Sequence, residues 1–313
     1  MVSGRIEARD DPGFGEALVG DGRPLLVVSA LALVAFGAFA MFLAATGRFL
    51  PHDVEYLGMT GEQLCALHGC RIVHFMVHDR LTFGGVLVAI GVLYLWLVEF
   101  PLKRGESWAW WTLAASGGAG FASFLSYLGY GYLDTWHGVA TLGLLPLFAT
   151  GLARTRDLRR VPVARAPLDL ATRNGRGRAL LVLAGIGIVA AGLTITTVGA
   201  TMVFVPQDLE FIQATRADLR AVNDRLIPLI AHDRAGFGGA LFSFGIAMLA
   251  SVLFHPIGRS LWQALALSGT FGFATAIGIH PAIGYLSFTH LAPAVAGCLL
   301  YIAGLVLAWP RRA

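Results

Sequence analysis

The sequence predicts an all-α polytopic membrane protein, and three observations carry that prediction. Of its 313 residues, 56% are hydrophobic and only 13% are charged, with a mean hydropathy of +0.69, whereas soluble domains carry about a quarter charged residues. Eight apolar runs approach or exceed the roughly 20 residues that a helix needs to cross about 30 Å of hydrocarbon. These runs are continuous in Leu, Ala, Val, Gly and Phe, without the alternation that transmembrane β-strands show.

The eight expected transmembrane helices fall into two groups of four along the chain. They lie at residues 24–45, 81–100, 108–127, 133–152, 179–203, 235–254, 261–279 and 283–309. The first run exceeds the apolar stretch of about 7–15 residues in a secretory signal, so we expect a retained membrane anchor. Residues 1–23 mix both signs of charge with Gly and Pro and are expected to form a cytoplasmic tail.

Lysine and arginine predict the orientation in the membrane. The linker at residues 153–178 holds eight arginines. The side that carries this linker and both termini, including residues 310–313, holds sixteen Lys and Arg, against seven on the other side, and the excess marks the cytoplasm. We therefore expect a protein of a bacterial cytoplasmic membrane, with outer loops at residues 46–80 and 204–234. The net charge of +4 fits contact with anionic lipid headgroups, and no nucleic-acid partner is expected.

The two outer loops and the helices after them are copies of each other. LPHDVEY at 50–56 matches VPQDLEF at 205–211, and GYLDTWH at 131–137 matches GYLSFTH at 284–290. Both loops then offer a helix start of the capping-box type, at Thr60 and at Thr215. The chain is therefore predicted to be a tandem duplication of a four-helix unit, 24–152 and 179–309. We expect two four-helix bundles related by a pseudo-twofold axis along the membrane normal.

The positions at which the two copies still agree are rich in polar residues. The offset is 154 residues between His78 and His232, and 153 between His137 and His290. Four of the nine histidines thus form matched pairs. The other matched positions are Asp79 with Asp233, Arg80 with Arg234, Phe83 with Phe237, and Gly84 and Gly85 with Gly238 and Gly239.

The matched histidines predict a haem site in each four-helix unit. At a rise of 1.5 Å per residue, His78 on the second helix and His137 on the fourth lie at nearly the same depth near the outer face. The same holds for His232 and His290 in the second unit. Facing side chains in a bundle core build cofactor sites, and two opposed imidazoles are the axial ligands of a b-type haem.

The residues around these histidines fit a haem. Arg80 and Arg234 are expected to bind haem propionates by forked hydrogen bonds. The pairs Gly84–Gly85 and Gly238–Gly239 are expected to leave room for the macrocycle, against which Phe83 and Phe237 could pack.

Two other interpretations of the same residues stay open. The His-Asp-Arg stretch is also explained as a polar network that caps a span, with the glycines as ordinary contacts between membrane helices. A non-haem metal such as copper or zinc, held by three or four histidines, is a further alternative. That alternative requires the histidines of both halves to converge.

The sequence resembles the haem A synthase family. The resemblance rests on two tandem four-helix units, a histidine on the second and fourth helix of each, an arginine shortly after the first histidine, and cysteines in the first outer loop. It implies that His232 and His290 ligate a resident haem b. It also implies that His78 and His137 flank a second haem as substrate, haem O, whose ring methyl is oxidised to a formyl group.

The chain departs from the family's Glu-x-x-His-Arg motif. Phe75 and Leu229 stand where the glutamate is expected, and Asp79 separates His78 from Arg80. Asp79 is therefore a third candidate catalytic residue beside His78 and His137. The acids that both outer loops repeat either substitute for the glutamate or fix the loops: Asp53, Glu55, Asp208 and Glu210.

The first outer loop also holds Cys65 and Cys70, in an oxidising compartment where a disulfide is allowed. Five residues is too long a separation for a disulfide within an unbroken helix, but Gly69 could break the helix between them. A metal site with nearby histidines is the alternative for this pair.

Two rival functions remain beside the synthase-like enzyme. One is a diheme electron-transfer protein linked to a quinol or another redox partner, in which all four matched histidines are permanent ligands. The other is a structural or transport protein whose repeats serve packing. The expected partners are the lipid bilayer and haem, and a homo-oligomer is compatible with the sequence.

Overall fold

The computed structural model describes residues 13–125, 132, 135–163 and 167–310, and its regular elements are helices. The long helices are α2 (Arg23–Ala45), α5 (Arg71–Leu97), α6 (Ser107–Ser123), α7 (Thr135–Thr155), α8 (Arg173–Ala200), α11 (Leu226–Phe254), α12 (Arg259–Ile283) and α13 (Phe288–Leu307). The short ones are α1 (Phe14–Val19), α3 (Pro51–Leu57), α4 (Gly61–His68), α9 (Pro206–Ile212), α10 (Arg216–Val222), the π-helical turn η1 (Val98–Leu102) and the 3₁₀ turn η3 (Arg156–Leu158). The predicted all-α class is confirmed.

Seven of the described helices are long and apolar enough to cross a membrane. The remaining long helix, α6, has 17 residues, fewer than the roughly 20 that a span needs. Each predicted span coincides with a long helix, but the number of eight membrane crossings stays a prediction.

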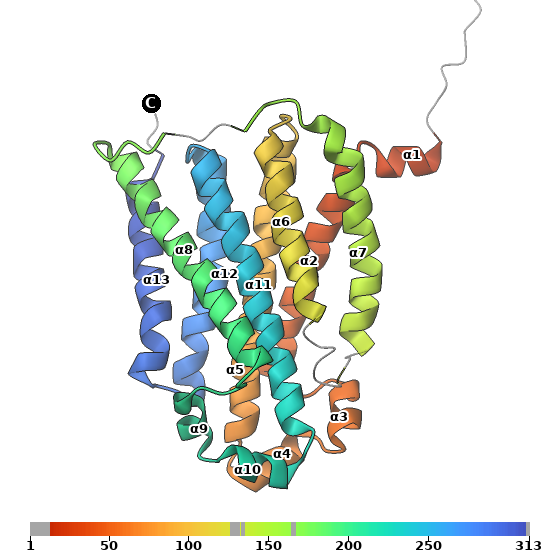
Figure 1. Cartoon of the computed structure of the whole chain (residues 1–313), viewed down its shortest axis with the longest axis vertical. Coiled ribbons are helices and arrows are strands. Elements are labelled where there is room, and N and C mark those ends of the chain that lie inside the picture. The colour runs from red at the N-terminus through yellow and green to blue at the C-terminus, as the bar shows by residue number, and fades with distance from the viewer. Residues whose placement is uncertain (1–12, 126–131, 133–134, 164–166, 311–313) are drawn as a thin grey trace, which may run out of the picture.

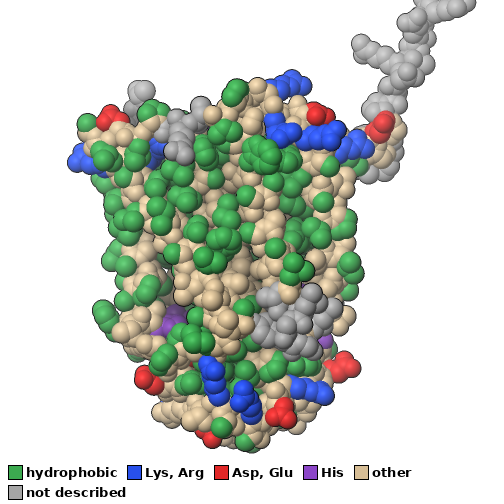
Figure 2. Space-filling view, viewed as in Figure 1, with side chains coloured by type: hydrophobic (Ala, Val, Ile, Leu, Met, Phe, Trp, Pro, Cys, Tyr) green, Lys and Arg blue, Asp and Glu red, His purple; other side chains and the backbone are tan. Residues whose placement is uncertain are grey.

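The long helices run side by side, and the two ends of the bundle differ (Figure 1). At the linker end, the chain passes from α7 to α8, and the described C-terminal residues lie there too. At the opposite end, which we call the cap end, lie the short helices α3, α4, α9 and α10. Hydrophobic side chains cover the middle of the face in Figure 2, while charged side chains gather at the two ends. This is the distribution expected of an integral membrane protein.

The two halves of the chain are interleaved. α5 packs extensively against α2 of its own half and against α12 of the other half, and α11 packs in the same way against α8 and α6. By contrast, α5 makes few contacts with α6 of its own half. Equivalent helices of the two halves therefore make equivalent contacts, while the predicted pseudo-twofold axis stays a prediction. The two four-helix units are not separate bundles, because the second helix of each packs on the third helix of the other.

The repeated glycines lie at these helix crossings. A Cβ on Gly84 would come 2.7 Å from the carbonyl oxygen of Gly37 on α2, and one on Gly85 would come 2.9 Å from that of Phe271 on α12. In the second half, Gly238 lies against α8 and Gly239 lies against Ser123 of α6 in the same way. The expectation that these four glycines border a space for a macrocycle is wrong. They allow close helix packing, as small residues do in membrane bundles.

The cap helices begin where the repeated loop sequences predict. Thr60 accepts a hydrogen bond from the backbone N–H of Gln63, and Thr215 from that of Asp218, so both capping boxes form. Between α4 and α5 the chain turns at Gly69, which has a φ of +56°. This break brings the α-carbons of Cys65 and Cys70 to 3.8 Å, and the predicted disulfide forms.

Candidate functional site

The matched histidines meet, but across the halves. The ring of His78 on α5 lies 5.6 Å from that of His290 on α13, measured between centroids. The ring of His137 on α7 lies 5.1 Å from that of His232 on α11. The predicted pairs, His78 with His137 and His232 with His290, are wrong because α5 and α11 each pack on the other half of the chain. All four rings do lie near the cap end, as their predicted depth requires.

The spacing of these rings does not fit a haem held between two histidines. The macrocycle of a bis-histidine haem lies between the two imidazoles, with the iron bound to both. Here the two rings of each pair touch, and they are tilted by 59° and 53°. The glycines expected beside the macrocycle are covered by neighbouring helices. Neither pair, as its rings lie here, has room for a haem between the two imidazoles.

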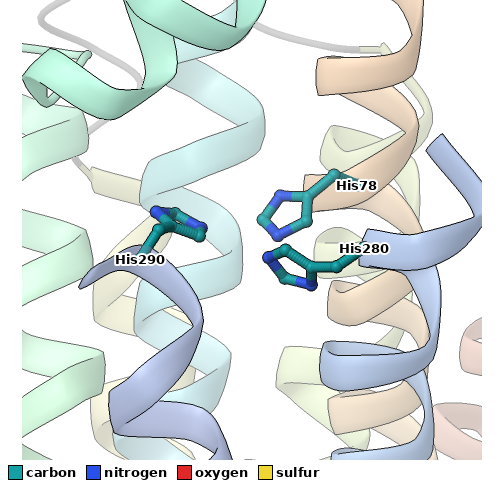
Figure 3. A group of neighbouring side chains, drawn as sticks. All are labelled: His78, His280 and His290. Atoms are coloured by element: carbon teal, nitrogen blue, oxygen red, sulfur yellow. The ribbon is translucent and has the colours of Figure 1, made fainter. Parts of the chain in front are cut away.

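A third histidine joins one of the pairs. The ring of His280 on α12 lies 4.6 Å from that of His78 and 5.3 Å from that of His290. Figure 3 shows the three rings converging from three helices, and one nitrogen from each lies within 4.8 Å of the others. We call His78, His280 and His290 the trihistidine cluster. Histidine nitrogens bind zinc at about 2.0 Å, so these nitrogens, which lie up to 4.8 Å apart, would have to draw closer to share one ion.

Carboxylates stand behind the trihistidine cluster. Nδ1 of His78 lies 2.9 Å from Oδ1 of Asp79, and Nδ1 of His290 lies 3.9 Å from Oδ1 of Asp208. In His78 this contact leaves Nε2 to face the other two rings. Metal-binding histidines commonly donate their second N–H to a carboxylate, which fixes the ring and makes it a better ligand. Asp79, a candidate catalytic residue from the sequence, therefore positions His78.

His280 is a residue that the sequence analysis missed. It is 3% exposed, and among the described residues only the backbone of Ala276 is placed to hydrogen-bond with its ring, so one ring nitrogen is left without a hydrogen-bond partner. A buried polar atom without a partner costs about 1–3 kcal/mol, so a ligand that binds it would remove a penalty. Its lack of a counterpart in the first half excluded it from the matched positions, although its place at the outer end of the seventh apolar run could have drawn attention.

The repeated arginines are ion-paired with aspartates. Arg80 donates to Asp233 and Asp53, each at 2.7 Å. Arg234 pairs in the same manner with Asp208 and lies 3.7 Å from Asp79. The expected role of both arginines as propionate partners would require them to leave these buried carboxylates. The loop acids Asp53 and Asp208 thus fix the cap helices to α5 and α11.

A tyrosine completes each network. Tyr132 donates to Asp53 at 2.8 Å, and Tyr285 donates to Asp208 at 2.8 Å. Burial alone would raise the pKa of Asp53, but the Arg80 guanidinium and the Tyr132 hydroxyl hold that pKa below its ordinary value. Asp53 is therefore a stable carboxylate and a poor candidate for a proton donor near neutral pH.

The second histidine pair borders a cavity of about 380 Å³ between α2, α5, α6, α7 and α11. His137 and His232 lie in its wall, together with Arg80 and Asp233. Phe83 lines the same cavity, and its ring centroid is 6.2 Å from that of His137. Its repeat partner Phe237 is instead buried in the hydrophobic core, 6% exposed. We call His137 and His232, with this space, the cavity site.

Neither family models, nor curated proteins, nor solved structures gave a match to this chain. The resemblance to haem A synthase therefore stays a prediction, and the function has to be argued from the site.

Proposed function

We propose that the chain is a metal-dependent membrane enzyme whose metal centre is the trihistidine cluster. The observation that carries the proposal is the convergence of three buried or half-buried imidazoles from α5, α12 and α13, with ligand atoms within 4.8 Å of one another. A non-haem metal requires histidines of both halves to converge. The cluster meets this condition, since His78 comes from the first half and His280 and His290 come from the second.

The donor set indicates the metal class. Three neutral imidazoles suit zinc, copper or ferrous iron better than calcium or magnesium, which prefer oxygen ligands. Three protein ligands leave a further coordination position for water or substrate, as in catalytic zinc sites. Asp79 and Asp208, behind two of the histidines, supply negative charge close to the cation. We therefore expect zinc or copper, with the metal supplying either an activated water or, as copper, one-electron chemistry.

A purely structural role explains the cluster less well. An apolar residue at position 280 would pack between α5 and α13 without the desolvation penalty of a buried imidazole that has a ring nitrogen without a partner. The repeat does not require a histidine there for packing, because the first half has no histidine at residues 126–128, the positions that correspond to His280.

Metal analysis of the full chain tests the proposal. The protein is purified in detergent, stripped with a chelator, reloaded with Zn²⁺ or Cu²⁺, and measured by elemental analysis. About one ion per chain is expected, and His280→Ala should lose it because two imidazoles are a weak site. His137→Ala is the matched control, since it removes a half-buried histidine outside the cluster. If the wild type binds no stoichiometric ion, or if both variants bind alike, the proposal is overturned.

A second candidate is the haem-binding oxidoreductase that resembles haem A synthase. One observation favours it: His137 and His232 border a cavity with aromatic walls, where a haem would be bound by one of the imidazoles and not between the two. Absorption spectroscopy of the purified protein distinguishes the two. A haem band that His232→Ala removes supports this candidate, whereas a haem-free protein that binds zinc or copper supports the first.

The membrane setting is part of the same proposal. We infer from the arginine distribution that the linker end faces a bacterial cytoplasm, so the trihistidine cluster lies near the outer face. Reporter fusions at the C-terminus test this orientation, and a reporter active only outside the cytoplasm would reverse it.

A further inference from the structure

The cavity site has a polar end and a large apolar wall. At the polar end are His137 and His232, together with two arginines and two aspartates. The apolar wall contains six phenylalanines: Phe36, Phe39, Phe83, Phe121, Phe124 and Phe148. A volume of about 380 Å³ lies within the range of roughly 300–1,000 Å³ typical of small-molecule sites. The two ends together suit an amphipathic molecule with a flat ring.

The cavity reaches the lipid-facing surface of the bundle. Phe36 and Phe39 of α2 line it and are 43% and 54% exposed. At the linker end α2 and α7 are in close contact, where a Cβ on Gly151 would meet Leu26 at 2.8 Å. The lining residues of α2 extend from Ser29 to Ala44, and those of α7 from His137 to Phe148. A hydrocarbon tail can therefore leave the cavity between these helices into the bilayer.

The charges at the polar end cancel. Arg80 is bound by Asp53 and Asp233, and Arg48 at the edge of the cavity balances the remaining negative charge. Among the described lining residues no buried cation is left over for a ligand's carboxylate or phosphate, and burying an unpaired charge is costly. This favours a neutral headgroup. The imidazoles of His137 and His232 offer hydrogen-bonding groups to such a head.

We propose that the cavity site binds the headgroup of a membrane quinone or quinol. This class combines a neutral flat ring, oxygen atoms that accept or donate hydrogen bonds, and an isoprenoid tail. The ring packs among the phenylalanines, its oxygens face His137 and His232, and its tail passes out beside Phe36 and Phe39. The inference does not depend on the metal centre, because no residue of the trihistidine cluster lines the cavity.

Binding of decylubiquinone to the full chain in nanodiscs tests this proposal, with isothermal titration as the measurement. About one quinone per chain is expected. Ala140 lines the cavity on α7, and Ala140→Phe should weaken binding by about tenfold or more, because the larger side chain overfills the space that the ligand needs. The matched control is Leu142→Phe, which adds bulk on the same helix at a side chain that is 77% exposed and outside the lining.

Further arms separate the ligand classes and the two proposals. Oleate and haemin carry the carboxylates that the charge argument disfavours, so they should compete poorly with the quinone. His137→Leu is a second test variant if Ala140→Phe aggregates on size exclusion, and it should also weaken binding. Zn²⁺ or Cu²⁺ content should be unchanged in both variants. The proposal is overturned if decylubiquinone does not bind, if oleate binds as tightly, or if neither variant weakens binding.

Discussion

The trihistidine cluster and the cavity site are each formed between the two halves from equivalent repeat positions, but their contents differ. Each is built around a histidine of the His-Asp-Arg stretch and a histidine near the start of α7 or α13, with ring centroids 5.1 or 5.6 Å apart. In one site His280 fills the space beside the pair. In the other, a cavity of about 380 Å³ is found beside the pair. One added imidazole thus distinguishes an ion-sized site from one of molecular size.

The polar framework behind the two sites is the same. In each, an arginine bridges two aspartates, one from a cap helix and one from the opposite half, and a tyrosine donates to the cap aspartate. The members are Arg80, Asp53, Asp233 and Tyr132 in one site, and Arg234, Asp208, Asp79 and Tyr285 in the other. The duplication has preserved this framework while the ligand positions diverged. We therefore assign the framework a structural role, and the functions proposed above rest on the differences between the two sites.

The largest expected effect comes from breaking this framework at its more buried arginine. Arg234 is 6% exposed in its side chain and Arg80 is 17% exposed. Arg234→Leu leaves two buried carboxylates uncompensated and should lower the free energy of unfolding by about 3–5 kcal/mol. Arg80→Leu should cost less, because water reaches its partners more easily. Thermal unfolding in detergent measures both, with the exposed Arg156→Leu as control. Equal losses at positions 80 and 234 would mean that the two frameworks do not differ in burial.

The next effect concerns the glycines at the helix crossings. A Cβ on Gly85 would meet α12, and one on Gly239 would meet α6, so Gly85→Val and Gly239→Val should each destabilise the protein by about 1–3 kcal/mol. Gly118 and Gly187 are the matched controls, because a Cβ there has nothing within 4 Å. Urea or thermal unfolding measures the difference. If the substitutions at 85 and 239 were harmless, the close interleaving of the two halves would be wrong.

Much of the fold could be predicted from the sequence, because its signals are local. Length and apolarity mark the long helices, and the threonines at 60 and 215 mark the starts of α4 and α10. The disulfide between Cys65 and Cys70 follows from a glycine that breaks the helix. The repeat itself is visible as matched letters. Each of these needs only neighbouring residues or a comparison of the chain with itself.

The partners of the histidines could not be predicted in the same way. Their depth follows from helix rise, but their pairing depends on which helices cross. Because α5 packs on α12 and α11 packs on α6, the rings meet across the halves. His280 was missed for a different reason. A comparison of the two copies selects residues that both copies have, and His280 occurs in only one. The residue that distinguishes the two sites is one that the copies do not share.

A smaller effect is expected at the tyrosines that complete the framework. Tyr285→Phe and Tyr132→Phe each remove a hydrogen bond to a buried aspartate and should cost about 1–2 kcal/mol. Burial and the neighbouring Asp208 raise the pKa of Tyr285, so its hydroxyl stays protonated as a donor. Thermal unfolding compares each variant with the wild type. The ring centroid of Tyr285 lies 4.4 Å from that of His290. If Tyr285→Phe reduced metal loading and Tyr132→Phe did not, Tyr285 would also help to position the trihistidine cluster.

The smallest expected effect is a pH dependence at the cavity site. The pKa of Asp53 is lowered in the folded protein, so its ionised form contributes stability at any pH above its ordinary pKa of about 3.9. That contribution is lost as the pH falls through the lowered value. Asp53→Asn should therefore be less stable than the wild type at pH 7, and the difference should shrink toward pH 3. Thermal unfolding at several pH values measures this, with Glu62→Gln on the exposed face of α4 as control. A stability difference that stayed constant with pH would mean that Asp53 holds α3 by shape and hydrogen bonding alone. The charge of Asp53 could then no longer be counted in the argument that the cavity suits a neutral ligand.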